Sequence, residues 1–101
     1  MHTVIRNYKG QPKLADELKK RSKDVESLIN TVPGFIAYYL VKSNDGMVSV
    51  TVCDDKAGCD ESSKRAANYL REELPDMKVA APEIIEGDLL FKFANYKTSS
   101  V

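Results

Sequence analysis

The stretch from residue 35 to residue 53 constrains the fold more than any other part of the chain. Two runs of apolar, β-branched and aromatic residues, Phe35–Val41 and Met47–Cys53, flank the tripeptide Asn44-Asp45-Gly46. Asp-Gly between such runs is typical of an antiparallel β-hairpin. We therefore expect two paired strands here, with the rest of the chain arranged around them.

The length of the hairpin turn decides which side chains share a face. A two-residue turn separates two sets, Tyr39, Val41, Val48, Val50 and Val52 on one face and Tyr38, Leu40, Lys42, Ser49, Thr51 and Cys53 on the other. A three-residue loop would instead place Val50 beside Leu40. With the two-residue turn, we expect the valine-rich set to meet the helices and the Tyr38 set to lie on the open face.

Apolar periodicity outside the hairpin predicts two more strands and two helices. Residues 4–8 form a short strand candidate, and a helix begins near Pro12 and ends before Pro33-Gly34. The apolar face of that helix comprises Leu14, Leu18, Val25, Leu28, Ile29 and Val32.

A second helix follows the hairpin, capped by Asp55 or Asp60 and stopped by Pro75. Its expected inner face consists of Ala66, Ala67, Tyr69, Leu70 and Leu74. These side chains are small, so we expect this helix to lie close to the sheet or to leave space beside it. Residues 83–94 form the last strand candidate, with Ile85, Leu89, Phe91 and Phe93 on one face.

The predicted order is strand, helix, strand, strand, helix, strand. This order predicts an α+β protein with the ferredoxin-like βαββαβ fold, in which both helices cover one face of a four-stranded antiparallel sheet. Residues 1–95 form this single domain, and residues 96–101 form a polar C-terminal tail. The uncovered face would leave Tyr38, Leu40 and Thr51 in water, so we expect a homodimer.

Composition excludes several classes of partner. Fifteen basic and fifteen acidic residues among 101 give zero net charge, which argues against nucleic-acid binding. No apolar run approaches the roughly 20 residues that span a bilayer, and the N-terminus lacks the pattern of a signal peptide, so we expect no membrane partner and a cytoplasmic location. Cys53 and Cys59 are too few for a zinc site and are expected to be free thiols, and we expect no metal.

Two stretches resemble a known family. VPGFIAYYLVKS runs from a helix end through Pro-Gly-Phe into a tyrosine-bearing strand, and VSVTVCDDKAGCDES runs from the third strand into the second helix. Both resemble the dimeric α/β-barrel superfamily, and within it the small proteins grouped with antibiotic-biosynthesis monooxygenases. The resemblance extends over nearly the whole chain in element order and is specific only in these two stretches.

The resemblance implies a dimer whose two sheets form a barrel, with a pocket in each subunit between sheet and helices. Some relatives oxidise polycyclic aromatic substrates with molecular oxygen and no metal or flavin, and others degrade haem. The haem-degrading relatives use an Asn on the first strand together with a Trp and a His. Asn7 matches the first of these, but the chain has no Trp and its only His is His2, so haem degradation and a cofactor are not expected.

Four residues are candidates for chemistry. Asn7 on the first strand and Tyr69 on the second helix are the candidate catalytic residues, because an amide or a phenol can hydrogen-bond a substrate oxygen. Tyr38 and Tyr39 are the candidate ligand-binding residues, since their rings can stack on a flat molecule. Each also has a structural interpretation, Asn7 as a strand-end residue and the tyrosines as core or interface residues.

Two functions therefore remain open. One is a cofactor-independent monooxygenase acting on an aromatic or polyketide-like small molecule. The other is a non-catalytic homodimer that binds a small apolar or aromatic ligand or serves as an assembly module. A connected cavity of several hundred Å³ reached by Asn7 or Tyr69 would favour the enzyme, and a filled core would favour the module.

Overall fold

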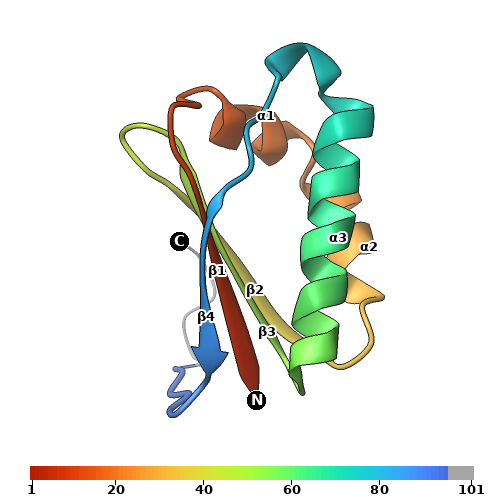
Figure 1. The fold of residues 1–101 in the computed structure, drawn as a ribbon, viewed down its shortest axis with the longest axis vertical. Helices are drawn as coiled ribbons and strands as arrows, with labels where there is room; N and C mark the ends of the chain where they lie inside the picture. The colour runs from red at the N-terminus through yellow and green to blue at the C-terminus, as the bar shows by residue number, and fades with distance from the viewer. Residues whose placement is uncertain (96–101) are drawn as a thin grey trace.

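The protein has the α+β ferredoxin-like architecture that the element order predicts. A computed structural model describes residues 1–95. It contains β1 (His2–Tyr8), α1 (Leu14–Lys20), α2 (Ser22–Asn30), β2 (Phe35–Lys42), β3 (Met47–Cys53), α3 (Lys56–Glu73), the 3₁₀ turn η1 (Pro75–Met77) and β4 (Glu83–Asp88). The strands form one antiparallel sheet in the order β2-β3-β1-β4, and the helices lie together on one side of it (Figure 1).

The hairpin has the pairing of a two-residue turn, but its faces are reversed from our expectation. Val41 pairs with Val48 and Leu40 with Ser49, so the two predicted sets of side chains do lie on opposite faces. The helices cover the set that contains Ser49 and Thr51, whereas Tyr39 and Val41 are more than half exposed. The prediction that Val50 meets the helices is therefore wrong.

Arg6 accounts for this reversal. Its side chain lies beneath the helices on the same face of β1 as Val4 and Tyr8, and all three are buried. The guanidinium donates hydrogen bonds to the hydroxyls of Ser49 and Thr51, which satisfies polar groups that would otherwise be costly to bury. The face that the helices cover is therefore the one with this polar cluster, although the opposite face of the hairpin is more apolar.

The first predicted helix is broken in two. Arg21 separates α1 from α2, and its backbone N–H donates to the Leu18 carbonyl three residues earlier, not four. The apolar stripe has no member between Leu18 and Val25, so no core contact holds this turn in a straight helix. The prediction of one continuous helix is wrong at this position, and α2 forms a separate helix between α1 and β2.

α3 begins where the cap signal predicts and packs closely on the sheet. The Asp55 carboxylate accepts a hydrogen bond from the Gly58 N–H at 3.0 Å. A Cβ on Gly58 would lie 2.7 Å from the Pro33 carbonyl oxygen, so only glycine allows this approach. Leu70 and Leu74 are buried as expected, but Ala67 is exposed, and Cys59 and Ser62 take the inner positions of the first turns.

β4 is shorter than predicted. It pairs with β1 as far as His2, the first residue of β1, opposite Asp88, and one further backbone hydrogen bond joins the Leu89 N–H to the Met1 carbonyl at 2.9 Å. Residues 89–95 have no regular structure, and Phe91 and Phe93 stack on each other while remaining exposed. The predicted tail, residues 96–101, lies outside the described residues.

The main core joins α1, α3 and the sheet. It comprises Tyr8, Leu14, Ala15, Leu18, Met47, Leu70 and Leu74. A smaller cluster joins Val4, Val32, Cys53 and Cys59. Within residues 1–95, no helix is both long and apolar enough to cross a bilayer.

Candidate ligand-binding site

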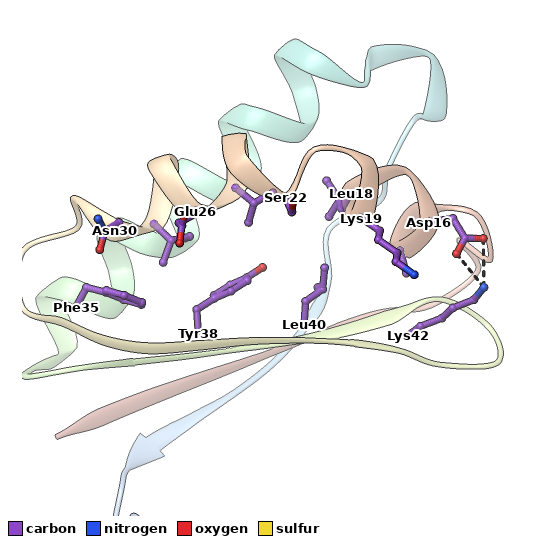
Figure 2. Close-up of a pocket in the computed structure, with 13 residues that line it drawn as sticks. Asp16, Leu18, Lys19, Ser22, Glu26, Asn30, Phe35, Tyr38, Leu40 and Lys42 are labelled. Atoms are coloured by element: carbon purple, nitrogen blue, oxygen red, sulfur yellow. Dashed lines mark hydrogen bonds and ion pairs between the residues drawn. The ribbon is translucent and has the colours of Figure 1, made fainter. Parts of the chain in front are cut away.

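A groove of about 610 Å³ lies between β2 and the helix pair α1 and α2. We call it the α1–α2 groove, lined by Ala15, Asp16, Leu18, Lys19, Ser22, Val25, Glu26, Ile29, Asn30, Phe35, Tyr38, Leu40 and Lys42. Figure 2 shows Phe35, Tyr38 and Leu40 rising from the strand toward the helices. The groove exists because alternate side chains of β2 point toward α1 and α2, and these helices do not pack directly against them.

The walls of this groove differ in chemistry. Its floor is aromatic and aliphatic, whereas Ser22, Glu26 and Asn30 present polar groups from α2 (Figure 2). At one end Lys42 Nζ and Asp16 Oδ1 form an ion pair at 2.9 Å, and this hydrogen bond with Lys42 lowers the pKa of Asp16. Such a groove suits a flat apolar molecule with polar groups along one edge.

Tyr38 is the most informative floor residue. Burial raises the pKa of its phenol above the ordinary value of 10.0, against the opposing effects of Arg6 and of a hydrogen bond with Ser49. The hydroxyl therefore stays protonated at neutral pH and can donate to a ligand oxygen.

A second cavity of about 540 Å³ lies between α3 and β4, at the other edge of the sheet. We call it the α3–β4 cavity, lined by Arg6, Tyr8, Ser63, Ala67, Leu70, Arg71, Leu74, Pro75, Lys78, Val79, Ala80, Ala81, Pro82 and Ile84. Most of its wall is apolar. Within residues 1–95, the charged residues of its wall are all cations, Arg6, Arg71 and Lys78.

Arg6 is 1% exposed and is held by four hydroxyl groups. Nη1 donates to Ser49 Oγ at 3.2 Å and Thr51 Oγ1 at 3.0 Å, Nη2 to Ser62 Oγ at 2.6 Å, and Nε to Ser63 Oγ at 3.1 Å. Burial lowers the pKa of Arg6 below its ordinary value. The result is a rigidly held cation with neutral partners.

The predicted site residues separate onto the two faces of the sheet. Tyr38 lies in the α1–α2 groove. Asn7 and Tyr39 occupy the open face, because they alternate with Arg6, Tyr8 and Tyr38, which lie on the covered face.

Tyr69 lies on the covered side but lines neither large cavity. Its ring borders a void of about 30 Å³ shared with Tyr8 and Tyr38, and its hydroxyl donates to Asp24 Oδ2 at 3.3 Å. The polar β1 side chain that reaches a cavity is Arg6, one residue before Asn7, and sequence reasoning missed it. Strand alternation with Val4 and Tyr8 was the signal that could have found it.

The two cysteines, Cys53 at the end of β3 and Cys59 in the first turn of α3, are buried free thiols. Burial, with a smaller contribution from Cys59, raises the pKa of Cys53 from 9.0 to about 11. Burial also raises the pKa of Cys59, whose Sγ donates to the His2 carbonyl at 3.3 Å. Both thiols are therefore uncharged at neutral pH and poor nucleophiles.

The fold is similar to that of solved structures described as antibiotic biosynthesis monooxygenases, as the two sequence stretches predicted. A protein of unknown function from Nitrosomonas europaea, NE2512, superposes with a TM-score of 0.69 at 16% identity over 93% of each chain. MhuD, in a variant with two manganese protoporphyrin IX molecules bound per active site, gives 0.70 at 14% identity over 94% of this chain and 100% of its own.

A third similar structure is a monooxygenase from the ActVA-Orf6 gene of Streptomyces coelicolor in complex with nanaomycin D. It gives a TM-score of 0.62 at 18% identity over 93% of this chain and 90% of its own. No protein-family model and no curated protein matches the sequence. At these identities the likeness establishes the fold.

The residues of this chain do not fit a haem held by histidine. His2, the only histidine, bonds Glu86 Oε1 at 2.9 Å through Nε2 and lines neither large cavity. Among residues 1–95, no group of three or more His, Cys, Asp or Glu side chains is placed to hold a metal ion.

Proposed function

We propose that the α1–α2 groove binds a flat aromatic or polyketide-like small molecule, and that the protein is a cofactor-independent monooxygenase acting on it. One observation carries the proposal: the groove of about 610 Å³ is floored by Phe35, Tyr38 and Leu40 and open along its polar roof. This volume lies within the usual range of small-molecule sites, roughly 300–1,000 Å³. The nanaomycin D complex of a protein with the same fold supports an aromatic ligand.

The chemistry asks little of the protein. An aromatic substrate with an activated CH₂ group ionises, the carbanion reduces O₂, and the carbon becomes a carbonyl while the second oxygen atom leaves as water. The substrate supplies all the electrons in this reaction. Stacking on Tyr38 would orient the ring, its hydroxyl would hold the substrate oxygen, and Glu26 at the roof would take the proton.

A second candidate is a non-catalytic homodimer that binds the same class of ligand. The positions of Asn7 and Tyr69 favour it, because neither residue lines the groove. Among residues 1–95, this leaves Glu26, which is solvent-exposed, as the one carboxylate that lines the groove besides the paired Asp16.

We also propose that the protein is a homodimer joined through the open face of the sheet. That face carries Tyr39, Val41 and Ile85, which are 54%, 52% and 69% exposed, next to Ile5 and Val50. An apolar sheet face without helices is commonly covered by a second copy. Asn7 would then lie in the interface. Two buried free thiols agree with a reducing compartment such as the cytoplasm.

Oxygen uptake with 1,8-dihydroxyanthrone as the substrate tests the proposal. We expect uptake that a metal chelator does not affect, accompanied by a product heavier by one oxygen and lighter by two hydrogens, and lost in Tyr38→Ala. Binding without oxygen uptake would favour the non-catalytic dimer. If the protein neither binds nor oxidises such compounds, the proposal fails.

A further inference from the structure

Arg6 is a buried cation without a counter-charge. In the described part of the chain, no carboxylate forms an ion pair with it, and the four groups that accept its hydrogen bonds are neutral hydroxyls. A guanidinium has five N–H donors, so one remains for a further acceptor. An isolated buried charge is costly unless a partner compensates it, which makes this arrangement unusual for a purely structural residue.

The ionisable neighbours of Arg6 do not supply the missing negative charge. They are Tyr8, Tyr38, Cys53 and Cys59. Burial raises the pKa of each, so all four remain protonated and uncharged at neutral pH. The compensating anion must therefore come from outside this cluster.

Arg6 and its partner Ser63 both line the α3–β4 cavity. Arg71 and Lys78 line the same cavity, and no acidic residue among residues 1–95 does so. The α1–α2 groove differs, because its Lys19 and Lys42 are accompanied by Asp16 and Glu26. Cations therefore predominate in one cavity and are balanced in the other.

We infer that the α3–β4 cavity is a second binding site that takes a small aromatic anion, with its carboxylate or phenolate oxygen directed to Arg6 and Ser63. The apolar body of the ligand would lie against Leu70, Val79 and Ile84, all of which line this cavity. Arg71 and Lys78 would add attraction at the mouth. This inference concerns a separate cavity and does not rest on the proposed function of the groove.

Two probes of the same shape test the inference. 2-Naphthoate carries the anion, and 2-naphthamide is its neutral counterpart. Titration followed by amide chemical shifts should show that the anion binds about tenfold or more tightly, as expected for a charge-assisted hydrogen bond in a buried site. Its shifts should centre on Ser63, Ala81 and Ile84. Equal affinity for both probes, or anion shifts centred on Leu40 and Lys42, would overturn the inference.

Variants separate the three cations from each other. Arg6→Gln should abolish the preference for the anion while leaving the affinity for 2-naphthamide within about twofold. Lys78→Gln and Arg71→Gln, which change exposed residues, should each weaken naphthoate binding by about two- to fivefold, since exposed charges contribute less.

Lys19→Gln, on the groove wall, is the matched control and should leave naphthoate affinity unchanged. If Arg6→Gln does not fold, the probe comparison still tests whether the α3–β4 cavity binds the anion, as do Arg71→Gln and Lys78→Gln. Unchanged naphthoate affinity in both mouth variants, or a loss in Lys19→Gln equal to theirs, would contradict the site. Failure of 2-naphthamide to bind the groove would count against the proposed function alone.

Discussion

The two faces of the sheet are built from adjacent residues yet differ in nearly every property. The covered face has a polar centre, where Arg6 bonds Ser49 and Thr51, and the α1–α2 groove and the α3–β4 cavity lie on that side. The open face is mostly aliphatic and aromatic and is left in water in the single chain, as Val41 and Ile85 show. The covered face therefore offers polar groups that a ligand could bind. The open face offers apolar surface that a second copy could cover.

The adjacent tyrosines of β2 illustrate this division. Tyr38 points under the helices and lines the α1–α2 groove, whereas Tyr39 points the other way and is 54% exposed. Strand alternation alone separates them. Our proposals place ligand binding on the covered face and assembly on the open face, and the predictions below test this division.

The largest difference between the faces should appear in stability. Met47 is 2% exposed in the main core, so Met47→Ala should lower the free energy of unfolding by about 2–5 kcal/mol. Val41→Ala on the open face should cost no more than about 0.5 kcal/mol in dilute, monomeric protein. Urea unfolding of both variants measures the difference. Similar costs would show that the faces are not distinct in packing.

Dimer formation should depend on side chains of the open face. Ile85→Glu would bury a charge in the proposed dimer interface and should weaken the dimer by about 100-fold while the fold is retained. Its neighbour Ile84, which lines the α3–β4 cavity instead, provides the control. Sedimentation of Ile84→Glu should match that of the unmutated protein. If Ile84→Glu dissociates the dimer and Ile85→Glu does not, the interface does not lie on the open face as we propose.

Alkaline pH should lower the free energy of unfolding through a thiol on the covered face. The pKa of Cys53 is about 11 in the fold and near 9.0 when unfolded, so the unfolded chain loses this proton first. Stability is then fully retained below pH 9 and falls as pH rises toward 11, by at most about 1.4 kcal/mol per pH unit for one thiol. Denaturant unfolding at pH 8, 9 and 10 measures the slope. Cys53→Ser should reduce it, and a slope that Cys53→Ser leaves unchanged would exclude this thiol as its source.

The smallest effect should follow Asn7→Ala. Asn7 lies on the open face between Val48 and Glu83 in the sheet, so its amide cannot enter the α1–α2 groove of its own chain. Affinity for a groove ligand should change by less than about twofold, as measured by fluorescence titration. A tenfold loss would indicate that the partner subunit brings Asn7 to the site.

Local sequence signals sufficed for most of the fold. The Asp-Gly hairpin, the Asp55 cap and Pro75 each act over a few residues, and each lies where it was predicted. The end of β4 could not be predicted in this way, because Asp88 lies opposite His2, where β1 begins at the other end of the sequence.

The candidate site was harder to predict for the same reason. Tyr38 was identified from its own strand, but the role of Arg6 depends on hydroxyls from β3 and α3 that only the folded chain brings together. The polar residues at alternate positions of β3 indicated the open face of the sheet. In the folded chain they are buried, because Arg6 donates hydrogen bonds to them. Long-range polar pairing of this kind leaves little trace in local periodicity.

The affinity of one aromatic ligand for Tyr38→Ala and Tyr39→Ala tests the central division most directly. The two variants remove the same side chain from adjacent positions of one strand, and 2-naphthamide is a suitable neutral probe. We expect Tyr38→Ala to weaken binding by about tenfold, which corresponds to the loss of a stacking aromatic contact, and Tyr39→Ala to change it by less than twofold. Equal losses, or a larger loss in Tyr39→Ala, would contradict the assignment of ligand binding to the covered face.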